Sequence, residues 1–121
     1  MGLILSDTNV IIYLLDGDKA IAELFDENII SISFITELEL LSARKYSQSQ
    51  EVKIKEFIQE LKIYEYNNLI KNACINLRQK YSLKLPDAII AATALIYQLP
   101  LFTSDKQFSK INEIEISLYT F

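Results

Sequence analysis

The sequence predicts an α/β domain with a mostly parallel sheet, and three observations support this prediction. Short apolar runs rich in β-branched residues alternate along the chain with longer segments of helical periodicity. Half of the 121 residues are hydrophobic, which is enough to build one compact core. Only two Gly and two Pro occur, which leaves no room for a flexible linker. We therefore expect a single domain over residues 1–121.

The first half of the chain predicts two strands and a series of helices. Leu3–Ser6 is a short apolar run followed by Asp-Thr-Asn, which is typical of a buried strand that turns into a helix near Val10. A second helix is expected over Lys19–Asp26. Ile29–Phe34 is rich in β-branched residues and favours a second strand. Helices should then dominate over Ile35–Lys62.

The next segments predict a brief strand and two longer helices. The strand is expected over Lys62–Tyr66. Apolar residues then recur at helical spacing between Leu69 and Tyr81. Pro86 favours the first turn of another helix, and residues 88–97 are apolar on nearly every side. That second helix should be buried by the sheet.

The C-terminal segment predicts two more strands with a short helix between them. Pro100–Thr103 reads as a strand that ends at Ser-Asp, and a short helix is expected around Phe108. Glu113–Tyr119 alternates in hydropathy and favours an edge strand. The residues of this strand expected to face inward are Ile114, Ile116 and Leu118.

Composition argues against several classes of protein. The chain has no histidine and one cysteine, Cys74, which lies in an apolar helical pattern and is expected in the core. A net charge of −4 and a pI near 4.8 argue against a broad basic surface that grips nucleic acid. The first residues lack the basic region of a signal peptide, and no apolar run is long enough to cross a bilayer. We therefore expect a soluble cytoplasmic protein without a membrane partner.

Four acidic residues occupy positions where a charged side chain seldom lies without a partner. They are Asp7, Glu39, Asp87 and Asp105. Asp7 and Asp105 each follow a predicted strand, and the carboxyl ends of parallel strands border the ligand crevice of such sheets. Taken singly, Asp is a common cap or turn residue at such places. The convergence of all four on one edge of the sheet is what indicates a site.

The two acids on helices are assigned to this set by the faces they occupy. If Ile35–Tyr46 is one helix, Glu39 shares a sector with Ala43 and points into the apolar face, while Glu37 lies on the solvated side. The alternative for Glu39 is a boundary residue that reaches water. Asp87 follows a proline in a first helical turn and could simply complement the helix dipole. It shares its face with apolar residues, however, so its carboxylate should project toward the edge of the sheet.

The chemistry of crowded carboxylates favours a bound cation. They repel one another unless a cation of high charge density holds them, and oxygen-only ligands favour Mg²⁺ or Mn²⁺ over zinc. A bound ion lowers the pKa of its water and supplies a nucleophile without a histidine base, which favours phosphodiester hydrolysis. Supporting roles are expected for Asn9, which would orient Asp7, and for Thr103 or Ser104, which would bind a metal water or phosphate. These three are equally common as cap and turn residues.

Several basic residues could form a track for phosphates, although scattered lysines usually belong to a solvated face. They are Arg78, Lys80, Lys84, Lys106 and Lys110.

Each of the four acids lies in a recognisable segment, and the segments follow one another along almost the whole chain. They are Leu-Ser-Asp7-Thr-Asn-Val-Ile, Ile-Thr-Glu-Leu-Glu39-Leu-Leu, Leu-Pro-Asp87-Ala-Ile-Ile-Ala-Ala-Thr-Ala and Leu-Phe-Thr-Ser-Asp105-Lys-Gln-Phe. Together they resemble the PIN-domain ribonucleases, particularly the toxins of VapBC-type toxin–antitoxin pairs. In the family pattern the second acid falls on Glu39. Gln107 departs from the pattern, because many relatives carry another Asp there, and this leaves the number of metal ions open.

The resemblance implies a three-layer α/β/α sandwich with a mostly parallel central sheet. It also implies metal-dependent endonucleolytic cleavage of RNA that leaves a 5′-phosphate, formation of a homodimer, and inhibition by a cognate antitoxin. An acidic pocket should attract a basic peptide, so we expect the antitoxin to insert Arg or Lys near the four acids.

Two other classes of function compete with this interpretation. One is a non-catalytic interaction module that keeps the fold and the dimer surface. The other is a phosphotransfer domain, either a receiver or a phosphatase with a nucleophilic Asp after the first strand. Asp7-Thr8-Asn9 lacks the second acid that is usual in such phosphatases, and no paired acid precedes Asp7 as receivers prefer.

Overall fold

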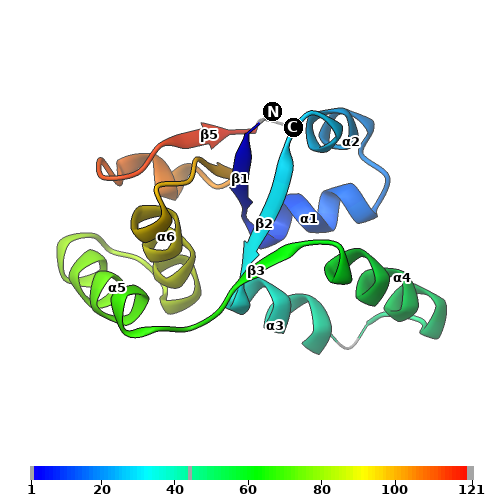
Figure 1. Ribbon diagram of the computed structural model, residues 1–121, viewed down its shortest axis with the longest axis horizontal. Coiled ribbons are helices and arrows are strands. Elements are labelled where there is room, and N and C mark those ends of the chain that lie inside the picture. The colour runs from blue at the N-terminus through cyan, green and yellow to red at the C-terminus, as the bar shows by residue number, and fades with distance from the viewer. Residues whose placement is uncertain (1, 44, 120–121) are drawn as a thin grey trace.

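The computed structural model describes residues 2–43 and 45–119, and within them one sheet forms the centre of the molecule (Figure 1). The described strands are β1 (Leu3–Ser6), β2 (Ile29–Ser33), β3 (Lys62–Tyr64), β4 (Leu101–Thr103) and β5 (Ile116–Leu118). They lie in the order β3-β2-β1-β4-β5, and every pair of neighbours is parallel. From β1 the chain builds outward first to β2 and β3 and later, on the other side, to β4 and β5. The order therefore reverses between β1 and β4, where sheets of this kind open a ligand crevice.

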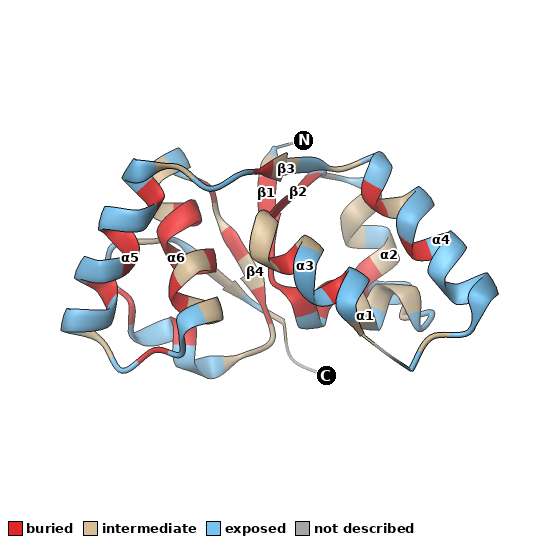
Figure 2. Ribbon diagram, turned by 90° about the horizontal axis from the view of Figure 1, so that it is seen from below, coloured by how far each residue is buried: buried red, intermediate tan, exposed pale blue. Residues whose placement is uncertain are grey.

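Helices cover both faces of the sheet, so the fold is a three-layer α/β/α sandwich, as expected. The helices are α1 (Thr8–Leu15), α2 (Lys19–Asp26), α3 (Phe34–Ser42), α4 (Gln48–Gln59), α5 (Asn68–Lys80) and α6 (Leu85–Tyr97), with a 3₁₀ helix, η1 (Lys106–Lys110). In both views α5 and α6 lie on one side of the strands, and α1 to α4 lie on the other (Figures 1 and 2). In the described part of the chain no helix is long and apolar enough to cross a membrane.

The two sides of the sheet carry separate hydrophobic cores because side chains alternate along each strand. On β1, Leu5 packs with α5 and α6, whereas its neighbour Ile4 packs with α1, α3 and α4. On β4, Leu101 and Phe102 divide between the two cores in the same way. Figure 2 shows the buried residues concentrated in the strands and on the inner sides of the helices. Burial on both faces explains why the sequences of these strands are continuous apolar runs.

Polar side chains set the starts of the helices that follow the strands. The side chain of Asp7 accepts from the backbone N–H of Thr8, and that of Ser33 accepts from the backbone N–H of Ile35. Each cap satisfies a backbone donor that has no partner within its own helix. Helices α1 and α3 therefore begin directly at the carboxyl ends of β1 and β2. Their first turns border the crevice.

One predicted helix is shorter than expected. The segment Ile35–Tyr46 was expected to be a single helix, but α3 ends at Ser42 and Ala43 is extended. The hydroxyl of Ser42 donates to the carbonyl oxygen of Leu38 at 2.6 Å, a local bond that competes with continuation of the helix. Ser47 then caps α4 through a capping box with Gln50, so a new helix begins at Gln48.

The last strand also differs from its prediction. Strand β5 covers Ile116–Leu118 and not the whole of Glu113–Tyr119. Leu118 was expected to face inward, but it is 39% exposed. An edge strand has a neighbour on one side only, which leaves its final residue uncovered.

Candidate active site

Asp7 lies at the centre of the crevice, at the end of β1 and the start of α1. Its backbone N–H donates to the carbonyl oxygen of Phe102 at 2.8 Å, which joins it to β4. Its Oδ1 accepts from the backbone N–H of Thr8 at 2.7 Å, and its Oδ2 accepts from Thr103 Oγ1 at 2.8 Å. The residue is 5% exposed. Both carboxylate oxygens are thus held by donors on the two sides of the point where the strand order reverses.

Burial raises the pKa of Asp7 to about 6. Hydrogen bonds from Thr103 and Thr8 oppose this rise, while the negative charges of Asp87 and Asp105 add to it. At neutral pH the carboxylate is therefore ionised at a cost in free energy. A nearby cation would remove that cost, because it would favour the charged form.

Thr103 connects Asp7 to Asp105. It is fully buried at the end of β4, where its hydroxyl donates to Asp7 and accepts from the backbone N–H of Asp105 at 3.0 Å. Asp105 in turn caps η1, since its Oδ1 accepts from the backbone N–H of Gln107 at 2.9 Å. Because its one proton is used by Asp7, Thr103 does not also donate to a phosphate, and a bond in which it accepts from a metal water stays a prediction. Ser104 lies beside it and is half-buried.

Asn9 does not have the role predicted for it. The donors that hold Asp7 are Thr8 and Thr103, whereas Asn9 is exposed on the first turn of α1. Orientation of Asp7 therefore comes from a backbone N–H and a buried hydroxyl. A sequence pattern could not identify Thr103 in this role, because it is 96 residues away from Asp7 in the chain.

Glu39 contacts the crevice through Thr8 and not, as predicted, from the apolar face of its helix. The residue is exposed, so the expectation that it points into the apolar face of its helix is wrong, and Glu37 is the less exposed of the two. The reason is that α3 stops at Ser42, so the apolar sector expected around Ala43 does not exist. Glu39 Oε1 nevertheless lies 2.7 Å from Thr8 Oγ1. It is the acid on α3 that contacts the residue next to Asp7.

Thr8 and Thr36 are site residues that the sequence interpretation missed. Thr8 Oγ1 lies 2.9 Å from the hydroxyl of Thr36, and both residues are buried. Since a hydroxyl has one proton, Thr8 donates to one acceptor at a time, and the carboxylate of Glu39 is the stronger acceptor. The pair joins α1 to α3 at the crevice. The available signal was the position of each threonine, next to Asp7 and one helical turn before Glu39.

Asp87 completes the group from the first turn of α6, where it is half-buried. Its pKa is raised by burial first, then by the charges of Asp105 and Glu39, and is lowered in part by Lys84. Asp7, Asp87 and Asp105 therefore lie within electrostatic reach of one another, and Glu39 lies within reach of Asp87. The structure thus brings together all four carboxylates that the sequence singled out. Whether each acts in catalysis stays a prediction.

The donor set suits a hard divalent cation, although the side chains are not gathered tightly. Among the residues that the structure describes, no three His, Cys, Asp or Glu side chains form a ready-made metal site. The four acids provide only oxygen ligands, and the whole chain has no histidine. Mg²⁺ and Mn²⁺ prefer oxygen and usually keep several waters, so they need few direct protein ligands. The raised pKa of Asp7 has the same implication, because the uncompensated negative charge there would be relieved by a cation.

Comparisons with known proteins agree with the fold. The model of the PIN domain matches residues 4–114. A solved toxin–antitoxin complex from Klebsiella pneumoniae contains a chain that is 33% identical, with 98% of this chain and 99% of that chain covered and a TM-score of 0.85. VapBC-1 from nontypeable Haemophilus influenzae is 26% identical, with 98% of each chain covered and a TM-score of 0.77. DNA-bound VapBC from Salmonella typhimurium is 23% identical over 97% of this chain and 98% of that one, with a TM-score of 0.85, which shows likeness of fold. No curated protein matches.

Proposed function

The chain belongs to the PIN-domain family, and on this premise we propose that it is a metal-dependent endoribonuclease, the VapC-type toxin of a toxin–antitoxin pair. The observation that carries the proposal is the environment of Asp7. Asp7 is a buried carboxylate with both oxygens held at the reversal point of the sheet, and the charges of Asp87 and Asp105 reach it. Such a group is costly unless it serves a charged ligand. A ribonuclease acts on RNA, so we also propose a cytoplasmic location.

The residues that would hold the ion are Asp7, Glu39, Asp87 and Asp105. When bound, Mg²⁺ or Mn²⁺ would lower the pKa of a water and offset negative charge on the phosphate. The chain's own contribution is to hold ligand oxygens in place. Thr8 and Thr103 fix the carboxylate of Asp7, and the Thr8 hydroxyl fixes Glu39.

A phosphotransfer reaction fits the structure less well. A phosphate-accepting Asp needs an accessible oxygen in line with the leaving group. Asp7 is 5% exposed and both its oxygens already accept hydrogen bonds. The non-catalytic interaction module remains a second candidate, since the fold alone would serve it equally well. It would be favoured if titration calorimetry detected no Mn²⁺ binding while a basic antitoxin-like peptide still bound.

We propose an antitoxin as the protein partner. The solved structure from Klebsiella pneumoniae, whose chain is 33% identical to this one, is a toxin–antitoxin complex. The four acids offer a surface for a basic segment, and an Arg inserted there would form charge-assisted hydrogen bonds. Neutralising the basic residues of the partner should abolish the complex, and unchanged affinity would contradict this part of the proposal.

We also propose that the chain forms a homodimer through an apolar face beside α5. A pocket whose lining is apolar apart from Lys71 lies between the start of α3, α5 and α6. Three of its lining side chains are large, apolar and exposed, namely Tyr66 (50%), Ile75 (48%) and Leu85 (52%). An apolar patch of this kind on a small domain usually marks an interface. A second copy of the chain would cover it by two-fold symmetry.

The nuclease activity is tested by incubating the purified chain with RNA in Mg²⁺ and in EDTA. Cleavage should occur only with the metal, leave a 5′-phosphate on the product, and be lost in Asp7→Asn. Glu56→Gln, an exposed carboxylate on α4, serves as the matched control and should cleave like the wild type. Cleavage that is equal in Asp7→Asn and wild type, or no metal-dependent cleavage at all, would rule the proposal out.

A further inference from the structure

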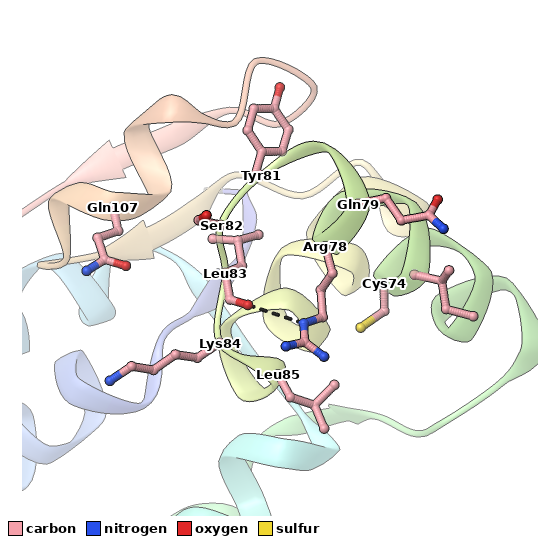
Figure 3. Close-up of a pocket in the computed structure, with 10 residues that line it drawn as sticks. Cys74, Arg78, Gln79, Tyr81, Ser82, Leu83, Lys84, Leu85 and Gln107 are labelled. Carbon is pink, nitrogen blue, oxygen red and sulfur yellow. Dashed lines mark hydrogen bonds between the residues drawn. The ribbon is translucent and has the colours of Figure 1, made fainter.

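A pocket of about 750 Å³ opens where α5 passes into α6, outside the group of four acids (Figure 3). Its lining comes from the last turns of α5, the connecting segment, the first residue of α6 and one residue of η1. Two of the lining side chains are cations, Arg78 and Lys84, and none is an acid. The pocket thus differs in sign from the chain as a whole, which has a net charge of −4.

Arg78 is held in place in this pocket by the backbone. Its Nε donates to the carbonyl oxygen of Leu83 at 3.2 Å, which is the dashed line in Figure 3. A guanidinium has five N–H donors, so four remain for other acceptors. Among the described residues no carboxylate forms an ion pair with Arg78. The side chain is thus oriented without being neutralised, which is the state that favours an anionic ligand.

The pocket shares a wall with the proposed active site. Lys84 lies three residues before Asp87, and Gln107 lies two residues after Asp105. The backbone N–H of Gln107 binds the side chain of Asp105 directly. In Figure 3 the side chains of Lys84 and Gln107 extend to the same side of the pocket, away from Cys74 and Gln79. A strand of substrate that leaves the acids would therefore meet Lys84 first and Arg78 next.

An acidic site alone would repel the phosphates on either side of the bond to be cut. A bound ion offsets this charge only locally, so the flanking phosphates need cations from the protein. We propose that this pocket binds a backbone phosphate of the substrate RNA next to the scissile bond, with Arg78 and Lys84 as its ligands. The inference rests on the proposed function and adds the place where the flanking strand is held.

Binding of a fluorescent single-stranded RNA, measured by anisotropy in EDTA so that the RNA stays intact, tests this proposal. Arg78→Gln and Lys84→Gln should each weaken binding about tenfold. Each should also reduce the slope of log K against log salt by about 0.7, the contribution of one phosphate contact on a single strand. Lys53→Gln on α4 removes the same charge from an exposed position on the far side of the sheet and should bind like the wild type.

Lys84→Gln is the stricter of the two variants. Its side chain makes no capping bond to α6, so its replacement should leave the thermal midpoint unchanged, whereas Arg78→Gln also loses the bond to Leu83. The proposal would be overturned if Lys84→Gln bound RNA with the affinity and salt slope of the wild type. It would also be overturned if Lys53→Gln lost as much affinity as the pocket variants, or if the wild type showed no measurable RNA binding. If the wild type binds RNA through this pocket but never cleaves it with Mg²⁺, the nuclease proposal fails and the binding site stands. If the wild type cleaves RNA and both pocket variants bind and cleave as it does, only the binding site fails.

Discussion

Replacing Asp7 by Asn should make the metal-free protein more stable, although it removes a central residue of the proposed active site. The pKa of Asp7 is about 6 in the folded protein, against 3.8 for an unperturbed carboxyl. The folded state thus binds the proton more tightly than the unfolded state. Stability therefore falls as the pH rises from about 4 to about 6, and the full penalty is present above that range. Asn carries no charge, so the Asp7→Asn variant is free of this penalty.

The size of the effect follows from the shift in pKa. The difference between 3.8 and about 6 corresponds to a penalty of about 3 kcal/mol at neutral pH. Asn preserves the geometry, because its oxygen can accept from the N–H of Thr8 while its amide group donates to Thr103 Oγ1. It is also as good a helix cap as Asp. Most of the penalty should therefore appear as a gain in the free energy of unfolding.

Urea unfolding in EDTA measures this gain at two values of pH. At about pH 7.5 the Asp7→Asn variant should exceed the wild type by about 3 kcal/mol, and at about pH 5 by roughly half of that. Glu56→Gln on α4 is the exposed control and should change the free energy of unfolding little at either pH. A variant that is less stable than the wild type at about pH 7.5, or a gain that does not depend on pH, would refute the reasoning.

Three further predictions concern the metal, the buried hydroxyl and the dimer. Mg²⁺ at about a hundred times its Kd should stabilise the wild type by about 2.7 kcal/mol in a thermal melt, and EDTA should reverse this gain. The Asp7→Asn variant should respond weakly to Mg²⁺, and equal stabilisation of the variant and the wild type would contradict the proposed ligands. Thr103→Val should lower the free energy of unfolding by about 1–3 kcal/mol, since it leaves Oδ2 of Asp7 without a donor. Thr103→Ser keeps the hydroxyl and should keep the stability of the wild type. Identical urea unfolding curves for the Val and Ser variants would show that the bond contributes nothing. Tyr66→Lys should shift the chain from dimer to monomer in light scattering without loss of folding, because Tyr66 lines the apolar pocket and is 50% exposed. The matched change Val52→Lys on α4 (51% exposed) should leave the dimer intact. A dimer that persists in Tyr66→Lys would place the interface elsewhere.

The fold was predictable because each element has its own local signal. The helix over Lys19–Asp26 and the strand over Leu3–Ser6 have the bounds expected from hydrophobic periodicity. Asp7 and Asp105 were placed together because the carboxyl ends of parallel strands meet at one edge, which is a rule of topology and needs no side-chain detail. Predictions of this kind depend only on which segments are strands and in which direction they run.

The details of the site could not be predicted because they depend on contacts between distant segments. The facing of Glu39 was wrong because α3 ends at Ser42, so the longer helix on which the prediction rested does not form. Asn9 was chosen for its closeness to Asp7 in sequence, yet the donor that matters is Thr103, which comes from another strand. Side-chain partners across a sheet are set by register and burial, and neither is visible in one chain's local pattern.

The pairing of β1 with β4 has a consequence for how the protein is made. Residues on these strands are separated by most of the chain, and the bond between Thr103 and Asp7 spans 96 positions. A ribosome completes the N-terminal strand first, so Asp7 emerges long before its hydroxyl donor exists. Contacts of such high sequence separation also form late, because closing a long loop is entropically costly. The nascent chain therefore stays without an assembled acidic site until Thr103 and Asp105 have been synthesised.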